Sequence, residues 1–195
     1  PEVALRHIDE GLALLEREWA RLGQPDAAQQ RQHADARADL HNFRLDILQS
    51  VPALYEVALV ELAAAVEVEP DSYVKRLAYA QLLEQSDLPA AIKQYEEAVR
   101  IDPDQPLAHF NLGALFMNDA AARFQEANNE TDPLMVDSLM AEVRAKFLLA
   151  RPYLERAMEL QPDNREALRA LKQIALQLDD IEAYRRLEAL EAALP

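Results

Sequence analysis

Two histidines, His33 and His41, come nearest to a reactive or metal-binding arrangement in this 195-residue chain. They lie eight positions apart, with Asp35 and Asp39 between them. Imidazole and carboxylate groups bind zinc and related metals. In a helix, however, eight residues separate the histidines by about 12 Å along the axis, too far for both to reach one ion. We therefore interpret the segment as a solvated polar face, and rank an enzyme or metal-binding module last of three hypotheses.

Other sources of chemistry are missing from the sequence. The chain has no Cys, which excludes a cysteine nucleophile, a thiolate metal site and a disulfide. It contains neither a glycine-rich phosphate loop nor an HExxH motif. Its many Asp and Glu residues recur at helical spacing, which is typical of a solvated helix face. We predict that the protein is not an enzyme and has no catalytic residue, cofactor or metal.

The composition favours helices and protein partners. Half of the residues are apolar and only three are Gly, which argues for helix and against a large sheet. A net charge of -15 should repel nucleic acid and anionic membranes and favour a basic protein or peptide. The longest apolar stretch, residues 57–66, is interrupted by Glu61, so no segment is expected to insert into a membrane.

A short unit recurs along the chain, in which an alanine stands five positions before a Pro-Asp pair. The copies run from Ala65 to Pro70, Ala98 to Pro103 and Ala157 to Pro162, with a weaker one from Ala20 to Pro25. Proline ends a helix because it lacks an N–H and clashes with the preceding turn. We expect the Asp that follows to cap the next helix, and Asp163 with Glu166 has the spacing of a capping box.

Around these units the sequence resembles the tetratricopeptide repeat (TPR) family over about residues 51–194. The family pattern is W-x2-L-G-x2-Y, then A-x3-F, then P, with a 34-residue period. The first part is filled by His109, Leu112, Gly113 and Phe116, with His109 in the Trp place and Phe116 in the Tyr place. The second part is filled by Ala91, Tyr95, Ala98 and Pro103, and again by Ala150, Leu154, Ala157 and Pro162. The resemblance implies an all-α, right-handed superhelix of antiparallel helix pairs, A and B. Small residues would let helix backbones approach and large ones would fill the gaps, with His109 in a packing role.

We predict nine helices within a single domain, residues 1–195. Their expected ranges are 3–22, 26–49, 52–68, 72–85, 88–101, 105–127, 133–160, 164–178 and 180–193. Residues 1–50 would form divergent N-terminal helices, 51–104 regular repeats, 105–163 an expanded repeat, and 164–195 a C-terminal repeat or cap.

The expanded repeat should form a long helical hairpin. Pro103 and Pro162 are 59 positions apart, 25 more than one TPR period. Apolar residues recur at helical spacing on both sides of a single turn-like cluster, residues 128–132, and Pro133 suits the first turn of a helix capped by Asp132. We therefore expect both helices to be lengthened, the second with a bend at Pro152.

The apolar residues of this hairpin allow two interpretations. The favoured one is that they form its core and pack on a neighbour; they are Phe124, Leu134, Met135, Leu139 and Met140. The alternative is a protruding apolar edge, which would make the protein an assembly subunit that self-associates through the 116–147 hairpin.

The TPR resemblance implies a non-enzymatic scaffold that binds a peptide or partner helix in the concave groove of its A helices. The groove positions would be Leu77, Gln81, Phe110, Asn111, Ala114, Asn118, Arg169, Gln173 and Gln177. Residues 107–190 are also similar to a group of bacterial TPR proteins, many made with export signals. The chain begins with Pro1, so we expect its natural start, and any export signal with it, to have been removed. The cytoplasm and the bacterial periplasm both stay open.

Overall fold

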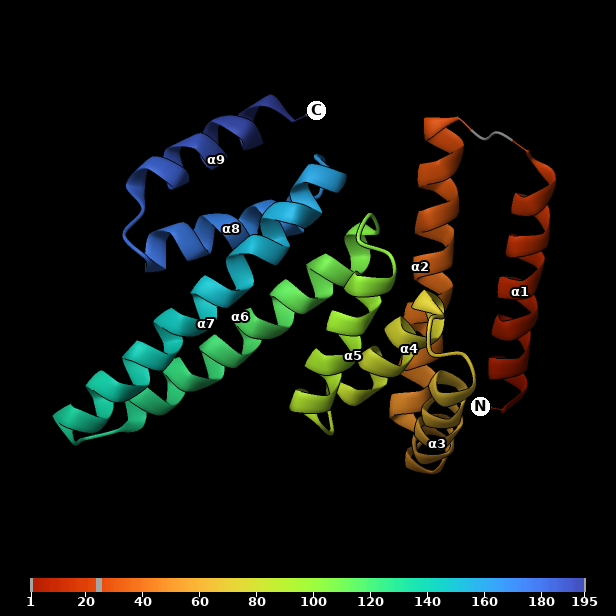
Figure 1. The fold of residues 1–195 in the computed structure, drawn as a ribbon, viewed down its shortest axis with the longest axis horizontal. Helices are drawn as coiled ribbons and strands as arrows, with labels where there is room; N and C mark the ends of the chain where they lie inside the picture. Colours follow the sequence, from red (N-terminus) through yellow and green to blue (C-terminus); the bar gives the residue numbers. More distant parts are fainter. Residues whose placement is uncertain (1, 24–25, 195) are drawn as a thin grey trace. The chain divides into compact units, whose positions relative to one another are not determined.

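The computed structural model describes residues 2–23 and 26–194, and in this part of the chain nine helices follow one another (Figure 1). The prediction of an all-α fold is confirmed, and every helix begins and ends within two residues of its expected bounds. The helices are α1 (Glu2–Arg21), α2 (Ala27–Ser50), α3 (Pro52–Val68), α4 (Tyr73–Leu83), α5 (Leu88–Ile101), α6 (Pro106–Asn129), α7 (Pro133–Leu160), α8 (Arg165–Gln177) and α9 (Ile181–Ala193).

The contacts divide the chain into two compact units, Pro1–Ala64 and Ala65–Pro195, where the sequence predicts a single domain. In the first unit α1 packs on α2, and Arg44 pairs with Asp9 across the two helices at 3.0 Å. In the second unit each helix from α4 to α9 packs on the next one along the chain. This succession of neighbouring helices is what the repeat pattern requires, because one helix pair cannot bury its own apolar faces.

The repeat motif residues form the core of the second unit, as predicted. Ala91, Tyr95 and Ala98 on α5 are fully buried, and so is Leu112 on α6. His109 is 6% exposed, and its packing role is confirmed. The small side chains bring helix backbones together and the large ones fill the space between pairs.

The Pro-Asp pairs make turns between helices, and the prediction that their Asp caps the next helix is wrong for three of the four copies. In these copies the residue after the Asp is the N-cap: Ser72, Gln105 and Asn164. Its N–H donates to the carbonyl three residues earlier, which places Pro second and Asp third in a four-residue turn. The helix itself starts at the residue after this N-cap. Asp26 does cap α2, in a capping box with Gln29.

The long hairpin is confirmed as α6 and α7, which pack against each other along their length (Figure 1). The turn between them is fastened by Glu130, whose carboxylate accepts from the N–H groups of Thr131 and Asp132. Asp132 caps α7 as expected, by accepting from Leu134 N at 3.0 Å, and Lys146 pairs with Asp119 at 2.6 Å. Long as these helices are, none in the described ranges has the apolar length that crossing a membrane requires.

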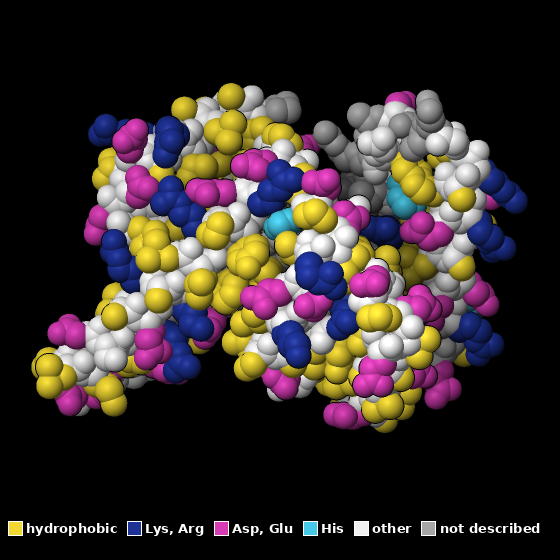
Figure 2. Space-filling view, in the orientation of Figure 1, with side chains coloured by type: hydrophobic (Ala, Val, Ile, Leu, Met, Phe, Trp, Pro, Cys, Tyr) yellow, Lys and Arg dark blue, Asp and Glu magenta, His cyan; other side chains and the backbone are white. Residues whose placement is uncertain are grey.

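The favoured interpretation of the hairpin's apolar residues is wrong for four of the five. Its core consists of Ala120, Ala127, Val143 and Phe147. Phe124, Leu134, Met135 and Met140 are exposed, Leu134 to 80%, while Leu139 is half-buried. Hydrophobic side chains therefore gather at the free end of the hairpin, at the lower left of Figure 2. The region beyond the repeat core has enough small residues for the helices to close on each other, which leaves its larger apolar side chains outside.

Gly113 tests how tightly α6 and α7 approach. A Cβ at this position would lie 2.6 Å from Leu154 Cγ and 3.3 Å from the Ala150 carbonyl oxygen. Leu154 is fully buried and cannot move aside. We expect Gly113→Ala to lower the free energy of unfolding by about 1–3 kcal/mol, although Ala is favoured over Gly by roughly 1 kcal/mol in a helix interior. Urea denaturation measures the difference.

Gly11→Ala is the matched control, because a Cβ at Gly11 in α1 meets only the Leu40 methyl groups, at 3.8 Å. This substitution should raise the free energy of unfolding by about 0.5–1 kcal/mol. A Gly113→Ala variant as stable as the wild type would contradict the close approach.

Candidate functional site

The nine predicted groove residues lie on α4, α6 and α8, the three A helices of the second unit. Leu77 is only 7% exposed, so it belongs to the core. The prediction that it contacts a partner in the groove is therefore wrong. Gln81, Phe110, Asn111 and Ala114 are half-buried; the exposed ones are Asn118, Arg169, Gln173 and Gln177. Helices α6 and α8 also contact each other.

A chain of hydrogen bonds holds Asn111 in place. Its Nδ2 donates to the hydroxyl of Tyr95 at 3.2 Å, and that hydroxyl donates to the carboxylate of Glu84. Tyr95 is a fully buried residue of α5, and Glu84 directly follows the last residue of α4. The network therefore joins α4, α5 and α6 at one point.

The network also fixes which way the Asn111 amide faces. An ionised carboxylate only accepts hydrogen bonds, so the Tyr95 O–H must donate to Glu84. The Tyr95 oxygen then accepts from the Asn111 NH2 group, and the amide cannot flip without losing this bond. Asn111 Oδ1 is left as the atom that can accept a hydrogen bond from a bound peptide N–H.

Burial sets the electrostatics of this network. It raises the pKa of the Glu84 carboxyl, and the hydrogen bond from Tyr95 opposes the shift. Burial also raises the pKa of the Tyr95 hydroxyl, helped by the negative charge of Glu84, so this hydroxyl stays protonated. A carboxylate held beside a half-buried amide attracts a positively charged group.

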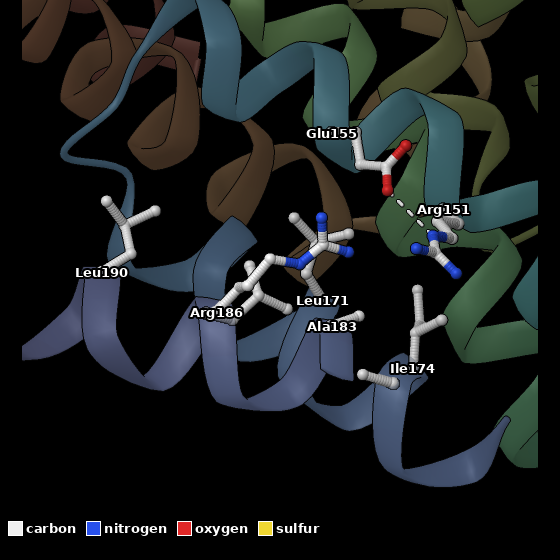
Figure 3. Close-up of a pocket in the computed structure, with 9 residues that line it drawn as sticks. Arg151, Glu155, Leu171, Ile174, Ala183, Arg186 and Leu190 are labelled. Carbon is white, nitrogen blue, oxygen red and sulfur yellow. Dashed lines mark hydrogen bonds and ion pairs between the residues drawn. The ribbon is translucent and has the colours of Figure 1, made fainter. Parts of the chain in front are cut away.

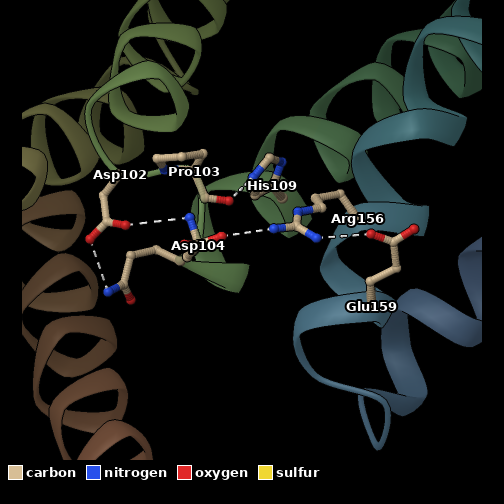
Figure 4. A network of polar contacts seen from close by, with 7 residues as sticks. Asp102, Pro103, Asp104, His109, Arg156 and Glu159 are labelled. Atoms are coloured by element: carbon tan, nitrogen blue, oxygen red, sulfur yellow. Dashed lines mark hydrogen bonds and ion pairs between the residues drawn. The ribbon is translucent and has the colours of Figure 1, made fainter.

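A second polar cluster positions α6 against α7 (Figure 4). His109 Nε2 donates to the Pro103 carbonyl at 2.9 Å, which ties the start of α6 to the preceding turn. From α7, Arg156 donates to Asp104 at 2.8 Å and to Glu159 at 2.9 Å. The charged groups each meet a complementary partner, whereas the buried His109 Nδ1 has no hydrogen-bond partner among the described residues. We read this cluster as structural because its contacts fasten α6 to the preceding turn and to α7.

A shallow pocket lies between α7, α8 and α9 (Figure 3). Its floor is apolar and includes Leu171, Ile174 and Leu190. Arg151 at its edge donates to Glu155 at 2.8 Å and to Asp180 at 3.1 Å. These carboxylates balance Arg151, and Arg186 is a second cation in the lining (Figure 3). The pocket therefore combines apolar surface with positive charge.

The predicted solvated face holds for Asp39, which is exposed, but not for His33. The His33 ring stacks on Trp19 of α1, with 4.1 Å between ring centroids, and its Nε2 lies 3.7 Å from a Glu16 carboxylate oxygen. The side chains of His41 and Asp35 are outside the described residues. Among the residues that are described, no group of three His, Cys, Asp or Glu side chains could hold a metal ion.

Sequence reasoning missed Glu84 as a member of the hydrogen-bond network that holds Asn111. It lies outside the repeat motif, one position beyond a helix end, among several acidic residues that look alike in the sequence. Its position could have been predicted from the spacing, because Glu84 comes eleven residues before Tyr95, on the other side of the turn between α4 and α5. A tyrosine at a buried repeat position needs a partner for its hydroxyl.

Comparison with known proteins supports the repeat assignment. Residues 81–119 match a family model described as TPR repeat, and they include Glu84, Tyr95 and Asn111. This segment of the chain is a tetratricopeptide repeat. Over 108 residues, 55% of the chain, it is also 32% identical to the mouse protein O-mannosyl-transferase TMTC1. The chain spans only 8% of that protein's length.

The match places the hydrogen-bonded network of Glu84, Tyr95 and Asn111 inside the recognised repeat. Residues 81–119 run from the end of α4 through α5 into the first half of α6. TPR repeats generally mediate protein–protein interactions, and the α6 residues that the sequence predicts to face the groove belong to the matched segment.

The raised pKa of Glu84 predicts a pH dependence of stability. The folded state binds this proton more tightly than the unfolded chain, so the stabilisation is complete below the usual Glu pKa and is lost as pH rises through the folded pKa. Relative to Glu84→Gln, the wild type should therefore lose free energy of unfolding as the pH rises above the usual Glu pKa of about 4.3. Urea denaturation at a series of pH values measures this.

Glu96→Gln provides the control, since Glu96 is an exposed carboxylate on α5, directly after Tyr95. Its difference from the wild type should vary less with pH. A wild-type minus Glu84→Gln difference that stays constant over the whole range would show that the Glu84 environment is not as described.

Proposed function

We propose that the protein is a non-enzymatic scaffold that binds an extended peptide or a partner helix on the A-helix face of α4, α6 and α8. The observation that carries this proposal is the fixed orientation of the Asn111 amide, whose Nδ2 donates a hydrogen bond to the Tyr95 hydroxyl. A fixed amide can hydrogen-bond a peptide backbone without first losing side-chain freedom, which reduces the entropic cost of binding.

The surroundings of Asn111 suit a peptide that is both apolar and basic. Phe110, its neighbour on α6, is half-buried and offers an aromatic surface. Glu84 adds a negative charge beside the amide, and the chain as a whole carries a net charge of -15. Complementary charge speeds association and selects among partners. The proposed ligand is therefore a segment with a Lys or Arg next to an apolar side chain.

Selection from a random peptide library tests this proposal directly. Peptides displayed on phage would be selected on the immobilised wild-type protein, and one enriched sequence would be synthesised. Calorimetry would compare its affinity for the wild type, Phe110→Glu and Asn111→Ala. We expect a loss of at least about tenfold for Phe110→Glu, equivalent to about 1.4 kcal/mol, and a smaller loss for Asn111→Ala.

The control is Ala121→Glu, an added charge at an exposed alanine of α6 that is not among the groove residues. It should bind the peptide as the wild type does. Arg169→Glu on α8 shows whether binding extends along the A helices. Enriched peptides that bind Phe110→Glu as tightly as the wild type would contradict the proposal.

A further inference from the structure

Helix α7 has two apolar faces, and only one of them is used in the fold. The buried face consists of Val143, Phe147, Ala150 and Leu154, which pack inside the second unit. Most surface helices carry charged or polar residues opposite their buried face. On α7 the opposite face is apolar as well.

This second face, here called the outer stripe, consists of Leu134, Ser138, Ala141, Ala145, Leu148, Leu149 and Pro152. At 100° per residue they fall within one third of the helix circumference, centred opposite Phe147 and Ala150. All seven are exposed, Leu134 to 80% and Leu148 to 53%. The stripe is about 28 Å long at 1.5 Å per residue and contains no charge.

The charged residues that flank the outer stripe are arranged in a self-complementary way. Asp137 and Arg151 flank one side, each seven residues from position 144. Glu142 and Lys146 flank the other side, each two residues from the same position. When two copies of a helix pair antiparallel about a two-fold axis, residues equidistant from the centre on the same side face each other. Pairing centred at position 144 would therefore bring Asp137 to Arg151 and Glu142 to Lys146 of the second copy.

From this pattern we propose that the outer stripe is a binding site for a second copy of the chain, with the two α7 helices antiparallel. Ala141 and Ala145 lie near the centre, where small side chains let helix axes approach closely. The larger Leu134 and Leu148 lie on opposite sides of the centre, so each would fill space over the small residues or Pro152 of the other copy. This site lies on the face of α7 away from α6 and is separate from the proposed groove.

The pairing should be weak and reversible. A standard protein–protein interface buries about 800 Å² on each partner, and a single helix face of this length buries less than that. The flanking groups are also shared with contacts inside the chain, such as Lys146 with Asp119 and Arg151 with Glu155. Arg144 would lie near its own copy at the axis, which opposes association. These terms favour a dimer that forms in the micromolar range.

Sedimentation equilibrium of the full chain, from about 5 to about 200 µM, tests for this weak dimer. The wild type should shift from monomer to dimer over that range. Ala145→Glu puts two carboxylates near the axis and should weaken the dimer at least tenfold. Ala121→Glu adds the same charge to an exposed alanine of α6 outside the stripe and should dimerise as the wild type does. Circular dichroism checks that both variants fold.

The register can be tested because the chain has no cysteine of its own. Ala145→Cys places one thiol beside the two-fold axis, and under mild oxidation it should give a disulfide-linked dimer. Ala121→Cys should cross-link far more slowly. A wild type that stays monomeric throughout, a dimer unaffected by Ala145→Glu, or equal cross-linking of the two cysteine variants would each overturn the proposal.

Discussion

The close approach of α6 and α7 at Gly113 is the contact on which the second unit depends. With no side chain at this position, Leu154 of α7 lies directly against the α6 backbone. Neighbouring core positions on both helices are small as well, including Ala120 and Ala150. Helices this close bury their inner faces with few large side chains.

The consequences extend to both ends of α6. At its start, His109 and the Asp104–Arg156 pair hold the helix to the preceding turn and to α7. Two residues after His109, Asn111 donates a hydrogen bond to the Tyr95 hydroxyl, which holds its side chain in place. At its far end, small residues again let α6 and α7 pack closely, and the larger apolar side chains of the hairpin stay exposed. Two surfaces of this hairpin are the ones for which we propose binding roles, the α6 face around Asn111 and the outer stripe of α7.

Much of this architecture follows from local sequence signals. Pro and the capping residues mark where helices end and begin, so the helix bounds could be predicted to within two residues. The buried positions of α5 and α6 follow from the repeat pattern, since each motif residue occupies a fixed place between helix pairs. Even the hairpin could be predicted, because a break between two long apolar periodicities has few other solutions.

Other features depend on contacts between distant residues, and the sequence does not reveal them. Helical periodicity shows that Phe124 and Leu134 share faces with other apolar residues, but not whether anything covers those faces. Whether His33 meets solvent depends on Trp19, fourteen residues earlier on another helix. Glu84 acquires its role from the Tyr95 hydroxyl alone. Candidate site residues are therefore harder to predict than the helices that carry them.

Hydrogen exchange along α6 and α7, followed by mass spectrometry on dilute protein, tests the central claim most directly. If the Gly113 contact anchors the hairpin, amides in residues 108–120 and 143–158 should exchange slowly, as part of the core of the second unit. Amides in residues 126–140, at the free end, should exchange much faster. Uniform exchange along both helices, or the fastest exchange near Gly113, would contradict an account in which this contact holds the unit together.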